Sequence, residues 1–316
     1  SVVIVENIPE SNLNINPVIT KKNKKKSTNK LMKAFIYLCL ILFALSILIP
    51  LGWSILAAFK HKSEFYGNPW ALPEGLYLEN FKTAFIKSHM GEYFFNSLFV
   101  TALALVILLV ISIPAAYVLS RFNFKSKKLL NTIFAAGLFI NVNYIVVPIF
   151  LLILDADKAI KQIFALPLSM TVFLDNKIVL ALVYASTALP FTIYLLSNYL
   201  KTLPRAYEEA AMIDGCSYLQ TLIKVIIPMA KPSIITVILF QFLAFWNEYI
   251  IALTLLPNSS KTLPVGLLNL MQVQKTATDY GAMYAGLAIV MIPTIILYIL
   301  VQKQLTEGMT VGGIKE

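Results

Sequence analysis

Polar side chains that could bind a hydroxyl-rich solute gather inside one long apolar stretch, residues 233–256. Trp246, Asn247 and Glu248 are consecutive there, and Gln241 precedes Glu248 by seven residues, which is two turns of a continuous helix. Amide and carboxylate groups hydrogen-bond hydroxyls, and an aromatic ring can stack on a sugar ring. If the stretch crosses a membrane, a charge at its centre costs at least about 2.5–3.5 kcal/mol and must face a cavity or a partner. These four residues are candidates for lining a pathway or gate.

A structural interpretation of the same residues stays open. Polar groups inside membrane helices also hold neighbouring helices together, and Glu248 could be satisfied by a neighbouring subunit. Asn141 and Asn143, in a second apolar stretch, are further candidates for the pathway under the same two interpretations.

A second cluster lies between two apolar stretches and predicts a short helix. Proline at the first position of a helix loses no hydrogen bond, so Pro204 is a natural start, and Gly215 beside Asp214 supplies a stop. Between them Ala206, Ala210 and Ile213 recur at helical spacing and form a narrow stripe of small residues. Glu208 and Glu209 lie on other faces of the helix.

The predicted short helix has two interpretations. Small residues let another surface approach closely, and the two acidic groups offer charge pairing. The apolar run after the helix ends at Pro228 and leads directly into residues 233–256, so a force on the helix would move that stretch. The alternative is a helix on the membrane surface with a solvated acidic face.

The sequence holds no arrangement typical of a catalytic or metal site. It has no Gly-x-x-x-x-Gly-Lys-Ser/Thr run to cradle phosphates and no Cys-x-x-Cys pair. His61 and His89 stand alone, without ligand spacing, and no serine has a histidine partner at the membrane. We therefore expect no catalytic residues, no metal and no cofactor in this chain.

Composition places these residues in a membrane. The 316 residues are 58% hydrophobic and only 13% charged, against about 25% in soluble domains. A helical span needs about 20 apolar residues, and six stretches meet that need: residues 34–59, 93–120, 129–154, 178–200, 233–256 and 280–302. The sequence predicts an all-α, polytopic protein with six transmembrane helices. The apolar connection 155–177 is short for a span and is expected to be re-entrant or interfacial.

The distribution of positive charge orients these spans. With the amino terminus inside, most of the 26 lysines and arginines fall on the cytoplasmic side, so both termini are predicted to be cytoplasmic. The chain is predicted to have three parts. These are a disordered basic cytoplasmic tail (1–33), a transmembrane domain (34–302) with a cytoplasmic loop at 201–232, and a cytoplasmic carboxyl tail (303–316). The basic tail fits anionic membrane lipid rather than nucleic acid, because no stacking platform accompanies it.

The segment around the short helix resembles the signature loop of permease subunits of binding-protein-dependent ABC importers. That pattern is Glu-Ala-Ala, three residues, Gly, nine residues, then Ile-x-Leu-Pro. Here Glu209-Ala210-Ala211 is followed by Gly215 and by Val225-Ile226-Ile227-Pro228. The resemblance implies the type I importer permease fold. It also implies that Glu208, Glu209, Ala210, Ala211, Asp214, Gly215 and Pro228 belong to a coupling segment that docks on a separate ATPase.

Three further segments are similar to the smaller permease subunit of maltose-type importers. They are "FLAFWNEYIIAL" at 242–253, "KTLPVGL" at 261–267 and "EGMTVGGIKE" at 307–316, and the likeness covers about residues 34–316. The resemblance implies four partners: a cytoplasmic ABC ATPase dimer that binds ATP and Mg, a second permease subunit, an extracytoplasmic binding protein and membrane lipid. It also implies that the solute is a sugar or oligosaccharide and that the cell is a prokaryote.

Two other classes of function compete with an ATP-driven importer subunit. An ion-coupled secondary carrier for a small polar solute would need intramembrane carboxylates, commonly paired, and usually an internal repeat. The six stretches hold one carboxylate, Glu248, and show no clear repeat. A membrane enzyme would need a catalytic constellation, which the sequence does not show.

Overall fold

The computed structural model describes residues 30–313 apart from 166, 168–170, 258–259 and 278. Within these residues every regular element is a helix. The long helices are α1 (Lys30–Ala57), α4 (Met90–Arg121), α5 (Lys127–Gly137), α6 (Val142–Ile163), α7 (Lys177–Thr202), α11 (Lys231–Trp246), α13 (Leu263–Ala277) and α14 (Tyr280–Gly313). The short ones are α2 (Lys62–Gly67), α3 (Glu79–Lys82), α8 (Ala206–Ile213), α9 (Tyr218–Thr221), α10 (Ile227–Met229) and α12 (Ile250–Leu255), with the π-helical turns η1 (Thr83–Lys87) and η2 (Leu222–Ile226).

The helices long and apolar enough to cross a membrane match four of the six predicted spans directly. In the described part of the chain these are Met32–Ala57, Met90–Arg121, Lys177–Thr202 and Tyr280–Gln302. Two bent helix pairs meet the same criterion only when each pair is taken as one span. Most of the predicted basic tail, residues 1–29, lies outside the described residues, and α1 begins at Lys30.

The third predicted span, residues 129–154, is not a straight helix. It is divided between α5 and α6, which meet at 106°. The break falls at 138–141, where the Asn141 side chain accepts a hydrogen bond from the Asn143 N–H at 3.0 Å and caps α6. Gly137, the last residue of α5, lies close to Pro190 of α7. A Cβ atom at position 137 would lie 2.8 Å from a side-chain carbon of that proline, so a larger residue would not fit without a shift. The asparagine cap therefore stabilises a break in this span, which a count of apolar residues does not reveal.

The fifth predicted span, residues 233–256, is also not a single straight helix. The bent pair is Tyr218–Met229 with Lys231–Trp246, at 76°, so this span begins within the loop and its long helix ends at Trp246. The π-helical turn η2 precedes Pro228, which has no N–H to donate to an α-helical ladder. The carboxyl-terminal part of the predicted span is a separate short helix, α12.

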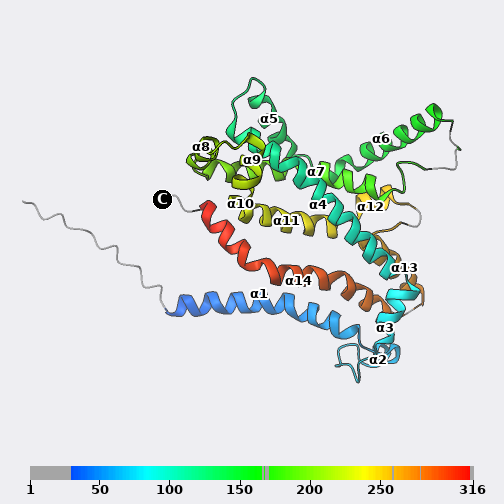
Figure 1. The fold of residues 1–316 in the computed structure, drawn as a ribbon. Helices are drawn as coiled ribbons and strands as arrows, with labels where there is room; N and C mark the ends of the chain where they lie inside the picture. The colour runs from blue at the N-terminus through cyan, green and yellow to red at the C-terminus, as the bar shows by residue number, and fades with distance from the viewer. Residues whose placement is uncertain (1–29, 166, 168–170, 258–259, 278, 314–316) are drawn as a thin grey trace, which may run out of the picture. The chain divides into compact units, whose positions relative to one another are not determined.

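Residues 1–50 and 51–316 form two units, and each is described by itself. In the second unit α4 and α7 pack along one another over most of their length (Figure 1). Their facing side chains include Ala104, Leu108, Ala181 and Tyr184, all nearly inaccessible to solvent. Small residues let the two backbones approach closely, as is typical of membrane helix pairs.

The two ends of the α4–α7 pair carry the two candidate sites. Figure 1 shows α8 and α9 at one end and α12 and α13 at the other. At the α8 end, a buried cluster joins α4, α7, η2 and α11 through Tyr117, Leu200, Leu222 and Val237. The long helix pair therefore connects the predicted coupling helix with the predicted polar site.

Candidate functional site

The predicted short helix is α8, and its end is set by a glycine. Gly215 has φ of +81°, in the left-handed region that favours glycine. The Cys216 N–H donates to the Ala211 carbonyl at 2.9 Å, and the Gly215 N–H donates to the Met212 carbonyl at 3.0 Å. This pair of bonds is a Schellman motif and satisfies carbonyls that the helix end would leave free. The predicted stop at Gly215 is confirmed, and Asp214 is the exposed C-cap beside it.

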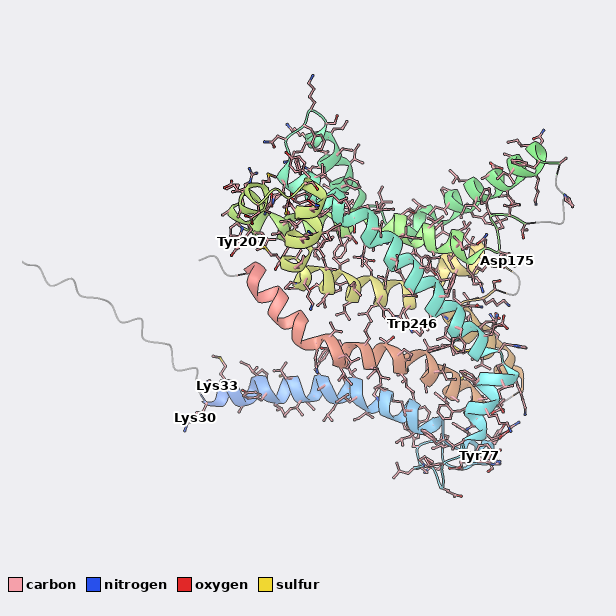
Figure 2. All side chains as sticks on the ribbon, viewed as in Figure 1. Lys30, Lys33, Tyr77, Asp175, Tyr207 and Trp246 are labelled. Carbon is pink, nitrogen blue, oxygen red and sulfur yellow. The ribbon has the colours of Figure 1, made fainter. Side chains whose placement is uncertain are left out.

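The two glutamates of α8 have opposite environments. Glu208 is buried, as is Ala211 one turn later, whereas Glu209 and Ala210 are exposed. On the exposed side Ile213 has 86% of its surface accessible, and Figure 2 labels Tyr207 on the same helix. The predicted stripe of Ala206, Ala210 and Ile213 is thus an exposed face that no described residue of this chain covers.

Glu208 forms an ion pair inside the chain. Its Oε1 lies 2.6 Å from Nε of Arg121, the last residue of α4, and only 5% of the arginine and 10% of the glutamate side chain is exposed. Arg121 also donates from Nη2 to the Leu203 carbonyl at 2.8 Å. Glu208 therefore contacts α4, and Glu209 is the acidic group of α8 that faces outward.

The chain continues from α8 into α11 through well-defined turns. The Ser217 Oγ accepts from the Gln220 N–H at 3.4 Å while the Gln220 side chain accepts from the Ser217 N–H at 2.9 Å, a capping box that starts α9. Leu222 and Ile226 of η2 are buried, and Pro228 of α10 is exposed. The chain from α8 to the start of α11 is thus held by local caps and by burial.

The predicted pathway residue Glu248 caps a helix. Its carboxylate accepts from the Ile251 N–H at 2.8 Å and the Ala252 N–H at 3.1 Å, the first free donors of α12. The Tyr184 hydroxyl of α7 donates to the same carboxylate at 2.7 Å. A carboxylate at a helix amino terminus is also favoured by the helix dipole. Within the described residues, all three hydrogen-bond donors to Glu248 belong to its own chain. As the structural interpretation proposed, the carboxylate holds helices together, but its partner is Tyr184 of this chain and not a residue of a neighbouring subunit.

Gln241 and Glu248 do not share a helical face. α11 ends at Trp246, and residues 247–249 are not helical, so the register assumed from seven-residue spacing is lost. Gln241 is buried and its Nε2 lies 3.4 Å from Oγ1 of Thr192 on α7. The break in the helix, made by the Glu248 cap, is the reason that the predicted face does not exist.

Trp246 is 1% exposed and belongs to a packed cluster (Figure 2). Its Nε1 donates to the Val290 carbonyl of α14 at 3.2 Å, and its ring stacks on Phe242. Asn247 beside it is exposed, with its amide donating to the Leu243 carbonyl at 2.8 Å. In this conformation Asn247, and not the tryptophan ring, is accessible to a solute.

The asparagines of the third predicted span have different positions. Asn141 caps α6 and Asn143 is exposed in its first turn, next to Tyr144, of which 83% is exposed. Among the described residues no hydrogen bond joins either asparagine to Glu248 or Tyr184.

Two residues that organise these sites, Tyr184 and Arg121, are not among the residues predicted from the sequence. Tyr184 lies within the fourth predicted span, and Arg121 directly follows the second. A hydroxyl in mid-span and an arginine at the end of the second span were the available signals. Neither identifies its partner, because each partner lies more than 60 residues away in the sequence.

In the described residues no group of three or more His, Cys, Asp or Glu side chains could hold a metal ion.

Comparison with known proteins identifies the family. The model for "binding-protein-dependent transport system inner membrane component" matches residues 109–311. This chain belongs to that family. The predicted class, an all-helical permease subunit of a binding-protein-dependent ABC importer, is therefore confirmed, and the permease is a multi-pass inner membrane protein.

Similar proteins match the permease over almost its whole length. The diacetylchitobiose uptake system permease protein NgcG of Streptomyces coelicolor is 30% identical over 287 residues, 90% of each chain. The probable ABC transporter permease protein YurM of Bacillus subtilis is 31% identical over 98% of this chain and 96% of that one. A solved chain of a bacterial ABC transporter involved in alginate import has a TM-score of 0.71 at 25% identity, over 88% of this chain and 97% of its own.

Proposed function

We propose that this permease is the membrane subunit through which an ATP-driven importer moves a sugar or oligosaccharide into the cell. The solute is delivered by an extracytoplasmic binding protein. ATP and Mg are bound by a cytoplasmic ATPase dimer, and a second permease subunit completes the pathway. Both termini face the cytoplasm in this proposal.

The observation that carries the proposal is the division of α8 into two faces. Glu208 and Ala211 fix the helix to its own chain, while Glu209, Ala210 and Ile213 are exposed. α8 exposes three large apolar side chains, Tyr207, Met212 and Ile213, and an exposed apolar surface of several residues marks an interaction site. The exposed face lies on the cytoplasmic side in the predicted topology, where the ATPase would dock.

Carbohydrate as the solute class is supported by the names of relatives. NgcG is named for diacetylchitobiose uptake, and the Streptococcus mutans relative MsmG, 28% identical over 92% of this chain, for multiple sugar-binding transport. Asn247, which directly precedes Glu248, is exposed. Its side-chain amide can hydrogen-bond the hydroxyl groups of a sugar. A pathway that passes this end of α11 would use Asn247 and leave Glu248 and Trp246 as its scaffold.

The proposal is tested by purifying the chain with the proteins that accompany it and reconstituting them in liposomes. We expect a second permease and an ATPase in the complex. Uptake of a labelled oligosaccharide should require internal ATP, Mg²⁺ and the binding protein outside. Uptake by the lone chain under an ion gradient, without ATP, would contradict the proposal and support a secondary carrier.

A further inference from the structure

We propose that Arg121 and Glu208 are positioning residues that lock the coupling helix α8 onto α4, so that the stroke of the ATPase moves α4 and α7 as one body. The inference rests on the proposed function. It adds α4 to the route of the force, because the chain itself joins α8 to α7 before it and to α11 after it, and not to α4.

One arginine side chain holds two parts of the coupling segment. Its Nε pairs with Glu208 in the first turn of α8, and its Nη2 bonds the carbonyl of Leu203 in the link from α7. A guanidinium carries three nitrogens, so one can lie against the carboxylate as an ion pair while another donates a hydrogen bond to the carbonyl, whereas a lysine has a single nitrogen. Arg121 therefore fixes both the start of α8 and the chain that leads to it.

Aromatic contacts extend the same attachment to α9. Phe122, the C-cap of α4, packs edge-on against Tyr117 of α4 at 5.5 Å and against Tyr218 of α9 at 5.3 Å between ring centroids. The end of α4 thus contacts both sides of the Gly215 turn, through Glu208 before it and Tyr218 after it.

Apolar burial completes the attachment. Ala116 and Tyr117 of α4 belong to one buried cluster with Leu196 of α7 and with Leu222 and Ile226 of η2. Because α4 and α7 also pack against each other along their length, a displacement of α8 cannot reach one of them alone.

The ion pair makes this attachment hard to release. Separating a buried pair leaves each charge without compensation in a site where water is excluded, which is strongly unfavourable. Glu209, the next residue, is exposed and has no charged partner among the described side chains. We infer that α8 exchanges contacts on its outward face during the cycle and keeps those of Glu208 throughout.

The first test compares matched charge removals in the reconstituted complex. Glu208→Gln and Arg121→Gln should keep ATP hydrolysis but lower the solute moved per ATP several-fold. Arg121→Lys, which keeps the charge and loses one of the two contacts, should have an intermediate effect. Thermal shift and co-purification of the partners report whether each variant still folds and assembles.

The second test replaces the ion pair with a covalent bridge. In a background with Cys39→Ser and Cys216→Ser, the pair Arg121→Cys and Glu208→Cys should be uncoupled. A bifunctional methanethiosulfonate long enough to span the two lost side chains should then restore uptake per ATP, and reductant should remove the effect.

Two results would overturn the inference. One is normal uptake per ATP in both single variants. The other is a cross-linked complex that hydrolyses ATP without uptake, which would show that α8 must leave α4 during the cycle. Failure of the proposed function is a separate result, because there the wild-type complex itself would show no ATP-driven uptake.

Discussion

At the scale of single residues, the same residue type serves different purposes according to what surrounds it. Glu208 is paired with Arg121 inside the chain, Glu209 is exposed, and Glu248 caps α12. The polar residues of α8 and of the Glu248 site therefore divide into scaffold and accessible groups. That division leads to two predictions for single substitutions.

The first prediction concerns the turn after the coupling helix. The left-handed conformation costs about 1–2 kcal/mol of conformational free energy for residues other than glycine, and asparagine and aspartate adopt it most readily among them. A Cβ at Gly215 meets no atom of this chain within 4 Å. We expect Gly215→Asn and Gly215→Asp to leave the isolated permease folded and to uncouple ATP hydrolysis from uptake, because a side chain would obstruct the docked end of α8. Normal uptake in both variants would show that nothing docks at this turn.

The second prediction separates scaffold from pathway at the end of α11. Hydrogen bonds to a charged group contribute about 1.5–3 kcal/mol, so Tyr184→Phe and Glu248→Gln should each lower the melting temperature of the purified permease. Asn247→Ala should leave that temperature nearly unchanged and reduce the affinity of the complex for its solute. Thermal shift and uptake kinetics measure the two effects. A lower melting temperature for Asn247→Ala, with unchanged uptake, would assign Asn247 to the scaffold.

At the scale of elements, polar caps decide where the spans break. The side chain of Asn141 caps the start of α6, and that of Glu248 accepts from N–H groups in the first turn of α12. The helices on either side of each cap are separate elements. In contrast, Pro114, Pro190 and Pro293 lie inside continuous helices. A side chain that satisfies the first free N–H groups of a new helix stabilises a break, whereas a proline alone removes one bond.

The third prediction concerns the outward face of α8. Exposed charges are screened within about 3 Å at 1 M salt but interact over about 30 Å at 0.01 M. Glu209→Lys should therefore weaken association with the ATPase strongly at low salt and little at high salt. Co-purification across a salt series measures this, with Glu74→Lys as a control on a different exposed surface. An identical salt dependence for wild type and Glu209→Lys would mean that this carboxylate pairs with no charge on the partner.

At the scale of the whole molecule, the long α4–α7 pair joins the two candidate sites. α8 is attached to one end of the pair by Arg121, and Glu248 is attached to it at Tyr184. A tilt of α4 and α7 together would therefore move α8 and the Glu248 group at the same time, and neither site would need a hinge of its own. The orientation of the pair in the membrane then decides on which side the coupling helix lies.

The fourth prediction tests that orientation. Cys216 directly follows Gly215 and is partly exposed. With Cys39→Ser, a membrane-impermeant maleimide should label Cys216 in inverted vesicles stripped of the ATPase and leave it unlabelled in intact cells. Leu76→Cys, at an exposed position in the segment between α2 and α3, should show the opposite pattern once Cys216 is replaced by Ser. Labelling of Cys216 from outside would place the coupling helix on the wrong side for an ATPase.

The sequence by itself determined the all-helical membrane class, the presence of α8 and its end at Gly215, since each depends on composition or on neighbouring residues. The sequence predicts the start of α8 at Pro204, whereas the helix begins at Ala206. The signature around Glu209 also indicated the family that the comparisons confirmed. Only the tertiary structure decided that Glu208 pairs with Arg121 of α4, that Glu248 accepts a hydrogen bond from Tyr184, and that the third and fifth spans are bent. The physical reason is that a buried polar group is satisfied by whatever the fold brings near it, and those partners lie in distant parts of the chain.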